Sequence, residues 1–167
     1  MNRKQILIGL IALFVGLMVY LGDRHPEQTY FIYKIDSTIS LHHVLPPLFG
    51  PLGKILPAFV HVFSFALLTA GILACNKRGC VVACIVWLSV DVAFELGQKF
   101  GVWSSSLMPS WFEGIPLLEN TANYFILGSF DVMDLAAIAA GSLVAYLTMM
   151  CTLERRVLSW VKREEGS

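Results

Sequence analysis

The sequence predicts an all-α membrane protein in which four transmembrane helices form one bundle, with residues 1–167 as a single integral membrane domain. Two observations support this prediction. Hydrophobic residues make up 56% of the chain and charged residues only 14%, whereas a soluble domain carries about 25% charged residues. The apolar residues also gather in four segments that are each long enough to cross a bilayer. The formal net charge is zero, so nothing in the composition indicates a nucleic-acid partner.

The first predicted span covers residues 5–22 and follows the basic pair Arg3 and Lys4. A cleaved signal peptide is the alternative interpretation of such an N-terminal segment. The apolar run is long for a signal peptide, and the residues before Gly22 lack the small-x-small pattern of a cleavage site. We therefore expect residues 5–22 to remain as the first transmembrane helix.

Three further apolar segments have the length of transmembrane helices. They cover residues 56–75, 80–100 and 130–151. A short basic turn at 76–79 separates the second span from the third, so these two helices should be antiparallel neighbours.

The other two connections, 23–55 and 101–129, are long, and we expect both to be partly helical. Prolines interrupt any long helix in the first of them: Pro26, Pro46, Pro47, Pro51 and Pro57. This loop is still quite apolar, so it should lie on the bilayer surface or cap the bundle. After the last span, residues 152–167 mix basic and apolar side chains, which predicts an amphipathic helix on the cytoplasmic membrane surface.

An even number of spans places both termini on one side of the membrane, and the distribution of Lys and Arg indicates which side. Most of these residues lie in the termini and the short turn: Arg3, Lys4, Lys77, Arg78, Arg155, Arg156, Lys162 and Arg163. The two long loops hold the remainder: Arg24, Lys34, Lys54 and Lys99. The positive-inside rule therefore predicts cytoplasmic termini and two loops on the outer side.

Small residues at four-residue spacing indicate close contact between helices in lipid. One series occurs in the second span and one in the fourth: Ala66, Ala70 and Ala74, then Ala137, Gly141 and Ala145. All four cysteines fall toward the cytoplasmic side, where thiols stay reduced, and we interpret them mainly as packing residues: Cys75, Cys80, Cys84 and Cys151.

The third predicted span carries a polar face. Asp91, Glu95 and Gln98 are spaced i, i+4 and i+7, so their side chains share one side of the helix. Each carboxylate costs at least about 2.5–3.5 kcal/mol in the hydrocarbon region, unless it faces a protein interior or a wet cavity. The spacing therefore predicts that this face lines an internal site.

Two other spans should bring polar side chains to a similar depth. At about 1.5 Å per residue, Asp91 lies near the middle of the membrane and Glu95 about 6 Å nearer its outer face. His61 is expected roughly 7 Å below the outer surface. Asp131 and Asp134 share a face at the outer start of the fourth span. We predict one cavity that opens outward and is roofed by the two long loops.

The residue types in this cluster suit acid–base chemistry and ligand binding. His61 and Glu95 are the candidate catalytic residues, acting as general acid and base. The expected substrate-binding residues are Asp91, Gln98, Asp131 and Asp134. A divalent cation is a candidate cofactor, because carboxylate oxygens suit Mg²⁺ or Ca²⁺ and an added imidazole would suit Zn²⁺ or Mn²⁺. Ser64 lies one turn from His61, but this spacing is ordinary and we do not expect it to be a nucleophile.

Each of these side chains also has a structural interpretation. His61 could be the hydrogen-bonded partner of a carboxylate, and a buried neutral Asp91 could bond to a neighbouring backbone group. Asp134 could be favoured by the helix dipole in the first turn of its helix. Asp131 and Gln98 could be ordinary interface residues.

Three short motifs resemble the VanZ-like family of small bacterial membrane proteins. Residues His61–Leu68 are similar to that family's His followed by aromatics and Leu at the start of a helix. Residues Phe94–Phe100 are similar to its Glu-x-x-Gln-x-Phe. Residues Phe130–Asp134, with Gly141 seven positions after the second Asp, are similar to its Asp-x-x-Asp motif. The three motifs occur in the family's order.

The resemblance implies a role in the bacterial cell envelope, because the name-giving member is linked to glycopeptide antibiotic resistance. It also implies a location in the bacterial plasma (inner) membrane. The chain has Ile138 where the family usually has Asn, and it lacks the Arg that usually precedes Asp131. An anionic ligand would therefore need another cation, for which Lys99 and Lys54 are candidates.

We expect a cell-envelope membrane protein that binds or processes an envelope or lipid-linked substrate at an outward-facing polar site. The alternative is a non-enzymatic interaction or assembly subunit of a membrane complex, in which the polar cluster is structural and the outer loops dock a membrane-protein partner. Transport is the third candidate, ranked last because four helices are few and the inner half lacks a polar path. The sequence leaves open whether there is any catalysis.

Overall fold

The computed structural model describes residues 1–23, 48–115, 118–119 and 121–164, with the backbone alone for 154–164. Most of the first loop is outside these ranges. The prediction that this loop lies on the bilayer surface or caps the bundle therefore falls outside the described residues.

The described residues form helices and turns, and none of them forms a strand. Four helices are long and apolar enough to cross a membrane, which confirms the predicted all-helical, multi-pass architecture. They are α1 (Arg3–Gly22), α3 (Leu52–Ile72), α4 (Lys77–Lys99) and the first part of α7 (Val132–Glu164). Three short helices follow α4: α5 (Gly101–Ser106), η3 (Ser110–Phe112) and α6 (Thr121–Leu127).

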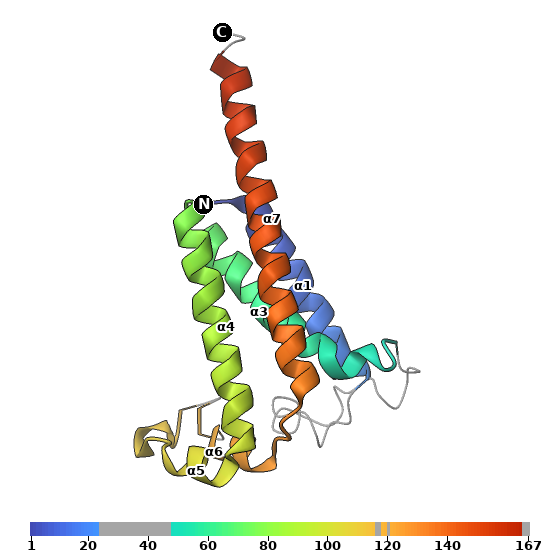
Figure 1. Ribbon diagram of the computed structural model, residues 1–167, viewed down its shortest axis with the longest axis vertical. Helices are drawn as coiled ribbons and strands as arrows, with labels where there is room; N and C mark the ends of the chain where they lie inside the picture. The colour runs from blue at the N-terminus through green and yellow to red at the C-terminus, as the bar shows by residue number, and fades with distance from the viewer. Residues whose placement is uncertain (24–47, 116–117, 120, 165–167) are drawn as a thin grey trace.

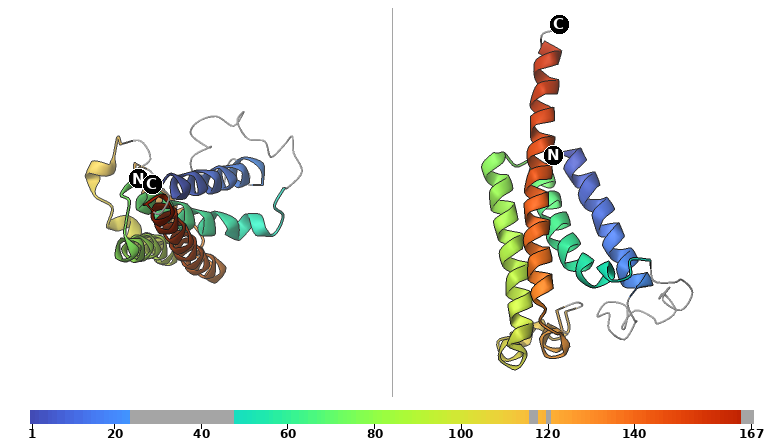
Figure 2. Two further views of the ribbon diagram at one scale, coloured as in Figure 1. Left: turned by 90° about the horizontal axis from the view of Figure 1, so that it is seen from above. Right: turned by 45° about the vertical axis from the view of Figure 1, so that its right-hand side comes forward.

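Helix α3 is the central helix of the bundle, because it packs against α1, α4 and α7. Helix α1 contacts α3 extensively but α7 very little. Helix α1 begins and α7 ends at the same end of the bundle, which we call the terminal end (Figures 1 and 2). Helices α5 and α6 lie beside the last residues of α4 at the opposite end, which we call the loop end (Figure 1).

The buried core occupies the half of the bundle nearer the terminal end. It combines small and large apolar side chains of α3, α4 and α7: Phe63, Ala66, Leu67, Ala70, Cys80, Ala83, Cys84, Ala145 and Met149. Cys80 and Cys84 are buried among them, as packing residues would be. The carboxylates of α4, Asp91 and Glu95, lie outside this core, toward the loop end.

The boundaries of α3 differ from the predicted 56–75. The helix begins at Leu52 and contains Pro57, so the expectation that Pro57 breaks a helix is wrong. Pro57 lies early in α3, where its missing N–H removes only one intrahelical bond. At the other end Ala74 has a left-handed φ of 53°, and the Cys75 N–H donates to the Ala70 carbonyl at 3.0 Å. This 6→1 bond closes the helix before Cys75.

Helix α4 begins earlier than predicted. The segment 76–79 was expected to be a turn, but Lys77 is already helical. Asn76 is the N-cap, and its Oδ1 accepts the Gly79 N–H at 2.9 Å. Asn is among the preferred N-cap residues because its side chain satisfies one of the free N–H groups at a helix start.

Helix α7 begins at Val132, two residues later than predicted, because the Asp131 side chain caps it by accepting the Met133 N–H at 2.8 Å. The helix then continues without a break to Glu164. The predicted C-terminal tail is thus helical and collinear with the last span (Figure 1). Its place on the membrane surface stays a prediction.

Small residues let the central helices approach closely. A Cβ atom added to Gly141 would lie 2.6 Å from the Phe59 carbonyl oxygen, so α7 and α3 meet backbone to backbone there. Ala66, Ala70 and Ala145 are fully buried. Ala74, in contrast, is exposed in the turn after α3 and takes no part in this packing.

Gly141→Val should destabilise the bundle by about 1–3 kcal/mol, because the new side chain would overlap the α3 backbone. Thermal unfolding in detergent measures this effect. Ala140→Val is the matched control, because Ala140 is exposed on the same helix. Equal melting temperatures for the two variants would contradict the close α3–α7 contact.

Candidate functional site

A His–Asp pair joins α3 to α4 in the middle of the bundle. The His61 Nδ1 lies 2.9 Å from Asp91 Oδ1 and 3.0 Å from Asp91 Oδ2. The Asp91 side chain is only 8% exposed, whereas His61 is 49% exposed. An ionised carboxylate can only accept hydrogen bonds, so with Asp91 ionised the proton is on Nδ1, and Nε2 is the ring nitrogen that is not bonded to Asp91.

The two partners sit at matching depth. His61 follows the first residue of α3 by nine positions, which is about 13 Å along the helix axis. Asp91 precedes the last residue of α4 by eight positions, or about 12 Å. The depth of His61 below the outer membrane surface stays a prediction.

Aromatic rings surround the imidazole of His61. The ring of Phe65 meets it edge-on at 4.5 Å, and the ring of Trp87 at 6.1 Å. Phe65 and Trp87 stack on each other at 4.7 Å. The Trp87 Nε1–H donates to the Thr69 hydroxyl at 2.9 Å, which fixes the indole between α3 and α4. The pair is thus held in place by side chains on both helices.

Glu95 lies one turn closer to the loop end on the same face of α4. Its side chain is 6% exposed, and its Oε1 accepts the backbone N–H of Asp131 at 2.7 Å. This bond ties α4 to the start of α7. The carboxylates of Asp131 and Asp134 are close enough to act electrostatically on Glu95. Three acidic side chains from two helices therefore gather at the loop end.

Gln98 faces α6 rather than the acidic residues. Its side chain packs where Gly128 leaves room, and a Cβ added to Gly128 would lie 2.6 Å from the Gln98 Cδ. Gln98 also hydrogen-bonds the hydroxyl of Tyr124. Burial raises the pKa of Tyr124 to about 12, with smaller contributions from Tyr20 and Glu95. Tyr124 is thus a neutral hydroxyl beside the acidic groups.

The structure brings the predicted site residues together in two groups on one face of α4. His61 and Asp91 form the first group. Glu95, Asp131 and Asp134 form the second. In the described ranges, no three His, Cys, Asp or Glu side chains are arranged so that they could hold a metal ion.

Ser64 does not contact His61. Its side chain is fully buried, and its Oγ has no hydrogen-bond partner among the described residues. No hydrogen bond therefore joins Ser64 to His61 in this conformation.

The sequence analysis did not single out two residues near these groups, Trp87 and Tyr124, nor the buried Gln5 at the terminal end. Trp87 lies one turn before Asp91 on the same helical face, a spacing that could have revealed it. Gln5 is a buried polar residue of α1 whose Nε2 donates to the Thr152 hydroxyl at 2.9 Å, and its position in an apolar span was a usable signal. Tyr124 had no such signal, because its position depends on how α6 folds back onto α4.

The chain was compared with protein-family models, curated proteins and solved structures. None of them matches it.

The raised pKa of Tyr124 predicts a loss of stability at high pH. The unfolded chain ionises this phenol near pH 10, whereas the folded protein does so near 12. The stabilisation is fully present below about pH 10 and is lost as the pH rises to about 12. The difference in melting temperature between the wild type and Tyr124→Phe should therefore shrink over this range. A difference that stays constant from pH 8 to about pH 12 would contradict a buried Tyr124.

Proposed function

We propose that this chain is a VanZ-like membrane protein of the bacterial cell envelope that binds or processes an envelope or lipid-linked substrate. In this proposal both termini are in the cytoplasm, and the loop end of the bundle faces outward. The excess of Lys and Arg at the terminal end supports this orientation. The three short motifs that resemble the VanZ-like family support the envelope role.

The observation that carries the proposal is the hydrogen bond between His61 and Asp91. Asp91 holds the imidazole by Nδ1 and would stabilise an imidazolium, so Nε2 is oriented to accept or donate a proton. His61 is half exposed on the side of the bundle, where a lipid-linked group could reach it from the bilayer. An Asp–His pair with one free ring nitrogen is suited to general base chemistry.

The second group provides the rest of the proposed site. Glu95 is a second acid–base candidate, because one of its oxygens is engaged by the Asp131 N–H and its carboxyl group is otherwise buried beside two acids. Asp131 and Asp134 would bind the polar part of the substrate. Gln98 and Tyr124 would hold α6 against the site.

A specific observation also favours the alternative of an assembly subunit. Each buried carboxylate of α4 already has a partner on a neighbouring helix, His61 for Asp91 and the Asp131 N–H for Glu95. Such bonds fix how helices align in lipid. In this alternative the half-exposed His61 would contact a partner protein.

Substitution of the pair separates the two functions. The variants His61→Ala and Asp91→Asn are expressed in a bacterial host that lacks its own copy of the gene. General acid–base groups contribute about 10²–10⁴-fold to rates, so variants that still accumulate in the membrane should fail to restore resistance to envelope-targeting antibiotics. Immunoblots of membranes and growth assays measure the two quantities. Ser89→Ala, which changes an exposed polar residue of α4, is the matched control.

Full restoration of growth by both variants would overturn the chemical role. Loss of membrane accumulation, or loss of a co-purifying membrane protein from the variants, would instead assign the polar pair to assembly.

A further inference from the structure

The chain that follows α4 is apolar and exposed. Residues 100–115, which we call the α5 segment, contain α5 and η3, and no charged residue occurs from 100 to 112. The side chains of Val102, Trp103 and Trp111 are 80%, 65% and 63% exposed. Large apolar side chains that gather on a surface in this way mark contact with another protein or with a membrane.

The polar groups of α5 are bonded within the segment itself. The Ser105 hydroxyl donates to the Val102 carbonyl at 2.8 Å. The Ser106 hydroxyl donates to the next carbonyl, that of Trp103, at 2.7 Å. The backbone N–H groups of residues 107 and 108 bond the two carbonyls that follow. The last carbonyls of a helix usually need water as a partner, so these bonds lower the cost of moving α5 into surroundings that are poor in water.

The α5 segment lies beside the end of α4, on the side away from α1 (Figures 1 and 2). Leu96 and Phe100 are both exposed and are spaced i and i+4, so they share one face at the last turn of α4. Helix α5 begins directly after Phe100. The exposed apolar surface of α4, a helix that can cross a membrane, therefore continues along the chain into the α5 segment.

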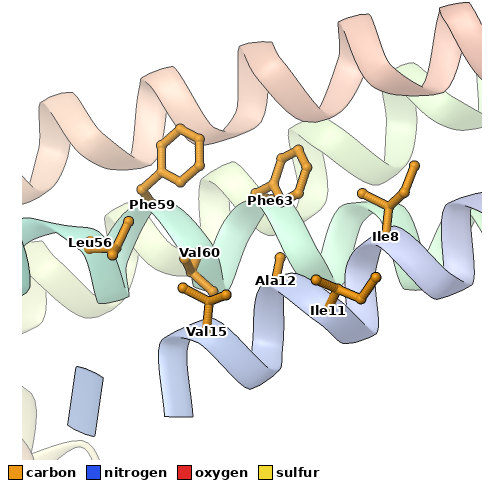
Figure 3. A pocket seen from close by; sticks show the side chains of 8 residues that line it. All are labelled: Ile8, Ile11, Ala12, Val15, Leu56, Phe59, Val60 and Phe63. Atoms are coloured by element: carbon orange, nitrogen blue, oxygen red, sulfur yellow. The ribbon is translucent and has the colours of Figure 1, made fainter. Parts of the chain in front are cut away.

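The sides of the bundle are suited to contact with acyl chains. From Leu7 to Leu17, every exposed side chain of α1 is apolar. A groove of about 430 Å³ between α1 and α3 is also lined by apolar residues alone (Figure 3). Tryptophan is enriched where such an apolar band meets the headgroups of a bilayer. Trp103 and Trp111 follow the end of a spanning helix, which is where this boundary is expected.

We propose that the α5 segment lies in the headgroup region of the leaflet at the loop end, with Val102, Trp103 and Trp111 inserted among the lipids. The partner of this surface is the bilayer, because the segment continues a lipid-facing helix and has no charge of its own before Glu113. The inference goes beyond the proposed function and does not depend on it. It holds whichever side of the membrane the loop end faces.

The position of the α5 segment also bears on α6. A Cβ atom added to Gly101 would lie 2.6 Å from the Phe125 carbonyl oxygen, so α5 and α6 meet backbone to backbone. The Phe125 ring also stacks on Phe94 of α4 at 5.6 Å. Lipid contact along α5 would therefore help to hold α6, and with it Tyr124, against the end of α4.

Depth-dependent fluorescence quenching tests the proposal. Trp87→Phe with Trp160→Phe leaves Trp103 and Trp111 as the only tryptophans of the full-length protein. The protein is placed in phosphatidylcholine vesicles that contain a lipid with a nitroxide either near the top of its acyl chain or near the end. The shallow nitroxide should quench most strongly, because interfacial side chains reach about 5–10 Å into the boundary between headgroups and acyl chains. Acrylamide on both sides of the membrane should quench weakly.

Matched variants in the same background test the apolar contact. Val102→Glu places a carboxylate among the lipids, so it should lower quenching by the shallow nitroxide and raise quenching by acrylamide. Val102→Leu keeps the side chain apolar and should leave both unchanged. Val102 is 80% exposed, so neither change disturbs packing within the protein.

A measurement on the wild type decides the proposal even if a variant fails to fold. A phosphatidylcholine with a diazirine near the top of one acyl chain is activated by light, and mass spectrometry maps the labelled residues. Label should appear on Trp103 and Trp111. His61→Ala should label in the same way, so a failure of the proposed chemistry and a failure of this inference give different results.

Three outcomes would overturn the proposal. Strong quenching by acrylamide, with no photo-label on the segment, would place it in water. Weak quenching by acrylamide and by both nitroxides would mean that a second copy or another protein covers the segment. Strongest quenching by the deep nitroxide would place it within the hydrocarbon core rather than among the headgroups.

Discussion

The hydrogen bond between His61 and Asp91 is the interaction on which the rest of the bundle depends. In a bilayer no water satisfies polar groups, so a carboxylate in mid-span must find its partner within the protein. Asp91 finds it on α3, and Glu95, one turn further along α4, finds it at the first residues of α7. These two bonds align three helices at their loop-end halves, and they require α4 to turn its polar face toward both α3 and α7.

The two halves of the bundle are built on different principles. Toward the terminal end, small residues and cysteines pack closely around Phe63, Leu67 and Met149, and the buried Gln5 hydrogen-bonds the Thr152 hydroxyl. Toward the loop end, buried polar groups set the arrangement, and α1 separates from α7. The half nearer the terminal end is therefore closely packed, and the half nearer the loop end holds the buried carboxylates of α4.

Much of this architecture could be predicted from residue spacing, because the spans and the polar face of α4 are local patterns. The predicted helix boundaries were less accurate, although Asn76 is a residue type that favours the N-cap position. The end of α3 could not be predicted, because Ala74 adopts a left-handed backbone conformation that alanine disfavours. The sequence analysis gave a hydrogen bond between His61 and a carboxylate only as one alternative. The depth of each residue along its helix does not determine which side chains pair. The position of Tyr124 and the apolar groove between α1 and α3 depend on tertiary packing, for which the sequence carries no local pattern.

The most direct test of this account is a double-mutant cycle on His61 and Asp91. The free energies of unfolding of His61→Ala, Asp91→Ala and the double variant are measured in detergent against the wild type. A hydrogen bond to the buried Asp91 carboxylate predicts a coupling energy of about 0.5–3 kcal/mol. A second cycle on His61 and Glu95 is the control, because Glu95 lies on α4 like Asp91 and bonds to Asp131 instead of His61. Additivity of the His61 and Asp91 effects within about 0.3 kcal/mol would contradict the pairing on which the site and the bundle are based.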